Sequence, residues 1–160
     1  MAQTARLFAD YVTALQLVVE EEFIGEALFE KLAGHHDGVA RQAFFLMAKI
    51  ERAMIAATEP AIRRNGLQLR DPESLHAEGR AEAETMRDMS WQQFLDHAIA
   101  DYPAFLEEFD QIARIAPPSD TAEAQILLDH EVAFIEFARA ARKGDPESNR
   151  ILENFLAGIS

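Results

Sequence analysis

The chain has 160 residues with 28 acidic and 15 basic side chains, which gives a formal charge of −13 at pH 7. Nucleic acids and anionic membranes bind to clustered Lys and Arg, so we expect neither as a partner. The longest stretch without a charged residue, residues 11–19, is far shorter than the roughly 18 residues of a membrane-spanning helix. There is no Cys and no signal-peptide pattern, so we expect a cytoplasmic protein with a single domain over residues 1–160.

Gly and Pro residues are few, and they separate long segments in which apolar residues recur at helical spacing. The first long helix is predicted from about Thr4, as its N-cap, to Ala33, and the second from after Asp37 to near Arg64. Neither segment has the alternating apolar pattern of a strand, and the same holds for the rest of the chain. The predicted fold class is therefore all-α.

The second half of the chain is predicted to contain two further long helices and two short ones. In chain order they are a short polar helix over residues 73–87 begun by Asp71-Pro72, a long helix from Ser90 to before Pro117, a long helix from Asp120 or Thr121 to Gly144, and a short amphipathic helix begun by Asp145-Pro146. Short turns within each pair of long helices make the partners antiparallel neighbours, and residues 66–89 are long enough to cross their length. We therefore predict two antiparallel helical hairpins joined by a long crossover, followed by a short C-terminal helix.

Ionisable side chains lie within the apolar stripe of all four long helices when the sequence is projected at about 100° per residue. They are Glu22 and Glu26 on the first helix, Glu51 on the second, Asp101 on the third and His130 on the fourth. Burying an unpaired carboxylate costs several kcal/mol, so these groups require a compensator. Metal ions, a captured proton, or buried Arg, His or Tyr partners would each serve.

This arrangement resembles the ferritin-like superfamily of di-metal carboxylate bundles, such as rubrerythrin and bacterioferritin, over about residues 4–142. Members have a Glu on the first and third helices and Glu-x-x-His on the second and fourth, and these inward groups hold two metal ions. The resemblance implies a ferritin-like four-helix bundle, one or two Fe or Mn ions and an oxidoreductase that acts on O₂ or peroxide. It also implies a homodimer, to which the apolar face of the tail helix around Phe155 would contribute.

The ligands that the resemblance implies are assigned position by position. The matching residues are Glu22, Glu51, Asp101 (or Glu108 in another register) and His130.

Two of the superfamily's standard ligand positions carry other residues in this chain. Met54 stands where the second helix would have its His, and Leu127 stands where the fourth helix would have its Glu. Thioether and isobutyl side chains offer no oxygen or nitrogen to Fe or Mn. Glu26 and Glu131 are the further acids available as ligands, although Glu131 projects about 60 to 70° from the centre of its stripe.

Two functions of different classes remain open to the sequence. In the first, these acids and His130 bind Fe or Mn, and the ion reduces O₂ or peroxide beside a pocket lined by Phe. In the second, the bundle is free of metal, the acids are paired with groups such as Tyr11 or His130, and the protein binds a small apolar molecule or a protein. No phosphate-binding loop, nucleophile elbow or His-Glu-x-x-His motif occurs, so a hydrolase is not expected.

Overall fold

The computed structural model of the protein describes residues 2–159, so the first and last residues of the predicted domain lie outside the described part. Residues 2–159 form α-helices and no strand, which confirms the predicted all-α class. The helices are α1 (Tyr11–Ala33), α2 (Gly38–Arg64), α3 (Pro72–Thr85), α4 (Trp91–Ile115), α5 (Thr121–Arg142) and α6 (Asn149–Gly158), with a 3-10 turn, η1 (Pro118–Asp120), before α5. Within the same residues, no helix combines the length and the apolarity needed to cross a membrane.

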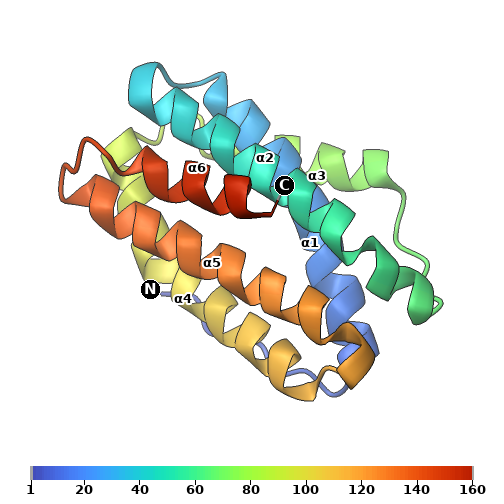
Figure 1. Ribbon diagram of the computed structural model, residues 1–160. Coiled ribbons are helices and arrows are strands. Elements are labelled where there is room, and N and C mark those ends of the chain that lie inside the picture. The colour runs from blue at the N-terminus through green and yellow to red at the C-terminus, as the bar shows by residue number, and fades with distance from the viewer. Residues whose placement is uncertain (1, 160) are drawn as a thin grey trace.

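The long helices lie side by side in two pairs (Figure 1). α1 packs along α2, and α4 packs along α5, while contacts of α2 with α5 and of α1 with α4 join the pairs around a common interior. α3 packs against α1, and α6 lies over α2 and α5. Apolar side chains of the four long helices fill the interior, and the fully buried ones include Leu15, Phe44, Phe94 and Phe137.

The first helix begins later than the sequence predicted. Its N-cap is Asp10, which has an extended backbone and whose carboxylate accepts the Thr13 N–H at 2.8 Å. A capping Asp satisfies an N–H that has no partner inside the helix, so it defines the start at Tyr11. The prediction of a start near Thr4 is therefore wrong.

Residues 2–10 run along α4 as an extended segment that is hydrogen-bonded to side chains of that helix. The Gln3 N–H donates to Asp101 at 3.0 Å, and the Arg6 N–H donates to Glu108 at 2.8 Å. These bonds satisfy backbone groups that a helix would otherwise satisfy internally, so helical structure is not required here. Gln3 and Arg6 consequently form part of the wall of an interior cavity.

Asp120 connects the ends of three helices through hydrogen bonds. It is fully buried, and its carboxylate accepts hydrogen bonds from the Tyr11 hydroxyl, the Arg64 guanidinium and the Asn65 amide at 2.7 to 2.8 Å. Of the two starts that the sequence allowed for α5, the structure has Thr121, and the Asp120 side chain makes no capping bond. The buried Asp120 carboxylate instead holds the end of α2, through Arg64 and Asn65, and the start of α1, through Tyr11, against α5.

The other helix ends follow the predicted signals with one exception. The capping box of α4 is confirmed, since Ser90 Oγ accepts the Gln93 N–H at 3.1 Å and Gln93 Oε1 accepts the Ser90 N–H at 2.8 Å. α6 begins at Asn149, after the predicted start at Asp145-Pro146, because the residues between form turns.

Gly79 allows α3 to approach α1 closely, because a Cβ there would lie 2.1 Å from the carbonyl oxygen of Ile24. We expect Gly79→Ala to lower the free energy of unfolding by about 1 to 3 kcal/mol, since backbone atoms of α1 cannot move aside as a flexible side chain can. Urea unfolding followed by circular dichroism measures the change. Gly158→Ala is the control, since a Cβ there meets no described atom within 4 Å. An equal loss in both variants would contradict this account of the contact.

Candidate metal centre

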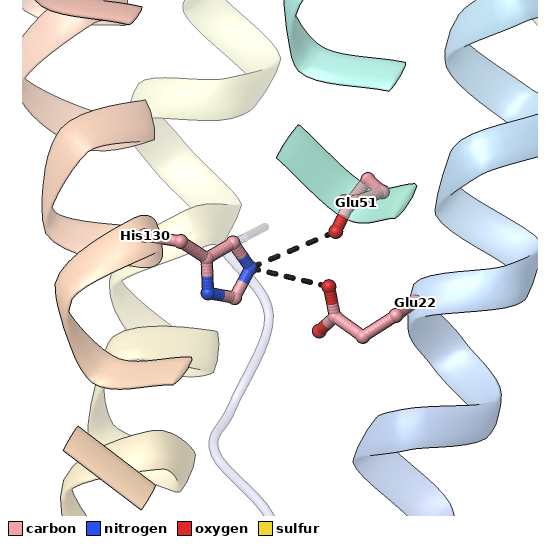
Figure 2. Close-up of side chains that lie close together, drawn as sticks. All are labelled: Glu22, Glu51 and His130. Atoms are coloured by element: carbon pink, nitrogen blue, oxygen red, sulfur yellow. Dashed lines mark ion pairs between the residues drawn. The ribbon is translucent and has the colours of Figure 1, made fainter. Parts of the chain in front are cut away.

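Glu22 of α1, Glu51 of α2 and His130 of α5 converge in the interior (Figure 2). Nε2 of His130 lies 3.4 Å from Glu22 Oε2 and 3.7 Å from Glu51 Oε2. The exposed fractions of Glu22, Glu51 and His130 are 3%, 7% and 1%. Among residues 2–159, these three form the group that could hold a metal ion, with ligand atoms within 4.8 Å of one another. Three of the ligands expected from the sequence thus meet at one buried point.

His130 is oriented by its own helix. Its Nδ1 is hydrogen-bonded to the carbonyl oxygen of Leu127, and because a carbonyl only accepts, Nδ1 carries the proton. Burial lowers the pKa of His130 to about 4, so the ring is neutral at pH 7. Nε2 therefore presents a lone pair to the carboxyl groups of Glu22 and Glu51, which is the tautomer that a metal ligand needs.

Each carboxyl group of the cluster has one buried oxygen that no described group satisfies. Within the described part of the chain, Glu22 Oε2, Glu51 Oε2 and Glu131 Oε1 are buried and have no hydrogen-bond partner. Burial raises the pKa of Glu51 to about 8. Burial also raises the pKa values of Glu22 and Glu131 well above their usual range, and the charges of neighbouring acids add to both increases. Without a cation these shifts favour the protonated acids, and a cation between them would displace their protons.

Gly25 provides the space in which the Glu51 carboxyl group lies. A Cβ at this position of α1 would be 2.7 Å from Glu51 Oε1, closer than real Cβ contacts allow. Any other residue would therefore push the carboxyl group out of its present position. The sequence offered a signal for this role, an isolated Gly inside a long helical segment, but projection of the apolar stripe does not use it.

Glu131 and Glu26, the two further acids that the sequence offered as ligands, lie in different surroundings. Glu131 adjoins the cluster, with Oε2 at 3.8 Å from His130 Nε2. Glu26 accepts a hydrogen bond from Arg52 at 2.6 Å and lies 3.3 Å from His76 Nε2, so its carboxylate is already paired.

The acids predicted for the third long helix are both engaged with other residues. Asp101 accepts the Gln3 N–H and lies 2.9 Å from His97 Nδ1. Glu108 is fully buried and is bound to Arg6 through two side-chain hydrogen bonds of 3.0 and 2.7 Å. Neither belongs to the group formed by Glu22, Glu51 and His130. The pairing of Glu108 was missed because Arg6 lies in the segment that was expected to be helical.

A cavity of about 390 Å³ adjoins the cluster, which forms part of its wall. Its aromatic lining consists of Phe29, Phe94, Tyr102, Phe105, Phe109 and Phe134. The His130 ring makes edge contacts with two of these rings, at centroid distances of 5.1 and 5.3 Å. A small apolar molecule beside the imidazole would therefore be surrounded by aromatic side chains.

Comparison of the chain with protein-family models, with curated proteins and with solved structures finds no match. Function therefore has to be inferred from the chemistry of this site.

The stability of the metal-free protein is expected to fall as pH rises from 6 to 8.5. The folded-state pKa of Glu51, about 8, lies above the value near 4.3 expected for an unfolded chain, so folding favours the protonated form. This contribution is complete below about pH 4.3 and is lost as pH rises through 8. Glu22 and Glu131 act in the same direction. Urea unfolding in the presence of a chelator measures the change.

Glu51→Gln should flatten this pH dependence, because the amide mimics the protonated acid and does not titrate. Glu30→Gln, at an exposed position of α1, should leave the pH dependence as it is in the wild type. Stability that stays constant or increases between pH 6 and 8.5 would show that the buried acids are not protonated in the metal-free fold.

Proposed function

We propose that the chain is a ferritin-like metalloprotein in which Glu22, Glu51 and His130 bind Fe or Mn, and in which O₂ or peroxide is reduced in the adjoining cavity. The observation that carries the proposal is the lone pair of the neutral His130 ring, which faces two unpartnered carboxyl oxygens in an apolar interior. Ligand atoms that bind one ion at about 2.1 Å lie about 3.0 to 3.4 Å apart, close to the separations of 3.4 and 3.7 Å seen here. Those separations are longer than hydrogen bonds.

The donor chemistry also supports Fe or Mn. Two carboxylates and one imidazole form a set of oxygen and nitrogen donors, which suits Fe(II) and Mn(II) and lacks the thiolates preferred by softer ions. The pairing of α1 with α2 and of α4 with α5 supports the ferritin-like assignment, because that resemblance implies two helical hairpins around an internal metal site.

Each residue near the centre would have a role that follows from its surroundings. The Leu127 carbonyl holds the His130 ring in the ligating tautomer, and Gly25 leaves room for Glu51. Glu131 Oε2 lies 3.8 Å from His130 Nε2, and because burial favours the protonated form of this acid, it would supply a proton to oxygen reduced in the cavity. A bound Fe or Mn ion would supply the electrons for that reduction. The aromatic side chains in the wall would favour a small apolar substrate such as O₂.

A metal-free protein that binds a small apolar molecule is the second candidate. It is favoured by the aromatic cavity of about 390 Å³ and by the raised pKa values of Glu22 and Glu51, which allow protons to compensate the buried acids. Met54, at one of the superfamily's usual ligand positions, is a fully buried core residue here. The two candidates differ in whether protons or a metal ion lie between the carboxyl groups.

Glu51→Gln is expected to weaken Mn(II) and Fe(II) binding by at least about 100-fold, because it removes a charged ligand of the buried site. Glu26→Gln is the matched control, since it makes the same change in an acid that is paired with Arg52. Its affinity should stay within about threefold of the wild type. Anaerobic titration followed by gel filtration and elemental analysis measures the bound metal.

Metal below about 0.1 ion per wild-type chain would refute metal binding, given the tight binding expected of such sites. Equal weakening by both substitutions would show that the effect is general electrostatics. Admitting air to the Fe(II)-loaded samples tests the redox half of the proposal. O₂ uptake by the wild type that is no faster than by the Glu51→Gln variant would leave a metal site without the proposed activity.

Gly25→Ala tests the position of the Glu51 carboxyl group without removing it. The new methyl group would meet Glu51 Oε1 at 2.7 Å, so the carboxyl group has to move, while Ala gains about 0.5 to 1 kcal/mol over Gly inside a helix. We expect metal affinity to fall by about tenfold or more, with the free energy of unfolding of the metal-free protein unchanged or higher. Calorimetric titration and urea unfolding measure the two quantities. Unchanged affinity would mean that Glu51 does not bind the metal.

A further inference from the structure

The guanidinium group of Arg6 lies between α1 and α4, in the wall of the cavity that adjoins the proposed metal centre. Its Nη2 lies 2.7 Å from Glu108 Oε2 and its Nε lies 3.0 Å from Glu108 Oε1, so both carboxylate oxygens are engaged. On the other side, Nη1 lies 2.8 Å from Glu21 Oε1. Arg6 and Glu21 line the same cavity as Glu22, Glu51 and His130. The arginine therefore joins two helices at the wall of the site.

A third acid, Glu131 of α5, lines the same cavity as Arg6 and Glu21. Its Oε1 is buried and, among the described residues, has no hydrogen-bond partner. Three helices thus each direct a carboxyl group to this region, while Arg6 alone neutralises two of the three groups.

We propose that the guanidinium of Arg6 takes the place of a second metal ion, so that each chain binds one metal ion at Glu22, Glu51 and His130 and no second ion beside it. The inference rests on the proposed metal function. An Arg side chain stays protonated in proteins, so its positive charge is permanent. Its planar fork donates to both oxygens of Glu108, so that carboxylate is already paired with a permanent cation.

Removing the guanidinium would uncover a site for a divalent cation. Glu108 and Glu21 would then lose the positive charge that they share, with the buried Glu131 in the wall of the same cavity as Glu21, and repulsion between carboxylates favours uptake of a cation. Oxygen ligands from three helices suit Mn(II) and Fe(II). The substitution is therefore expected to add a metal ion, whereas loss of an ordinary surface ion pair would add none.

The test is the metal content of the full chain after anaerobic titration with Mn(II), measured by elemental analysis and by the signal of bound Mn(II) in electron paramagnetic resonance. We expect about one ion per chain in the wild type and about two in Arg6→Ala. The double variant Arg6→Ala/Glu108→Gln should return to about one, because it lacks a ligand of the uncovered site. Arg142→Ala removes an exposed arginine that pairs with Asp96, and it should stay at about one.

Each result bears on either the proposed function or the role of Arg6. No metal in the wild type refutes the proposed function. About one ion in both the wild type and Arg6→Ala leaves that function standing and refutes the role of Arg6, as does about two ions in the wild type. Loss of metal in Arg6→Ala would also refute it, since the arginine would then support the first ion.

A folding defect would not prevent the test. Circular dichroism and gel filtration identify variants that do not fold, and Arg6→Gln, which keeps hydrogen-bond donors near Glu108, replaces Arg6→Ala in that case with the same expected gain of one ion. Arg6→Lys keeps the positive charge and should bind about one ion. Equal metal content in the Gln and Lys variants would show that the charge of residue 6 does not control the number of ions.

Discussion

The structure of the interior depends on how the charges of its buried acids are compensated. Glu22 and Glu51 approach a neutral imidazole beside a third buried acid, Glu131, and residues 2–159 supply no buried cation at that point. A charge in such surroundings costs several kcal/mol unless it is paired, so the carboxyl groups must either hold protons or share a cation. The alignment of three helices, the glycine in α1 and the orientation of the His130 ring all serve to bring these groups to one place.

Acids elsewhere in the fold are compensated in a different way. Arg64 pairs with Asp120 where α2 meets α5, and Arg6 pairs with Glu108 at the wall of the cavity. These arginines carry a charge that neither pH nor metal supply can change. In the proposed function the compensator of the central group would be exchangeable, because protons and a metal ion could replace one another there. Permanent ion pairs thus lie at the end of the bundle and at the wall of the cavity, whereas the charge of the central group would be variable.

The sequence predicted the features that depend on local signals. Helix caps, prolines and glycines gave most helix ends, the helical spacing of apolar residues gave the all-α class, and projection about each helix axis gave five inward groups that include the three residues meeting in the interior. Projection about one helix axis does not show which residues of a neighbouring helix lie at the same level of the bundle. It therefore left Asp101 and Glu108 as alternatives. It also cannot identify partners from segments that are not helical, which is why Arg6 was missed. Gly25 was missed because it acts through the space it leaves and not through a side chain.

The hydrogen bond between the His130 ring and the Leu127 carbonyl lies within α5, so the direction of the ring is set as soon as that helix forms. Glu22 and Glu51 reach the same point from α1 and α2, which precede the crossover helix α3. An ion held by all three would connect the two halves of the chain across the interior. Its departure would remove that connection, so the two helical pairs would open more readily in the metal-free protein than in the loaded one.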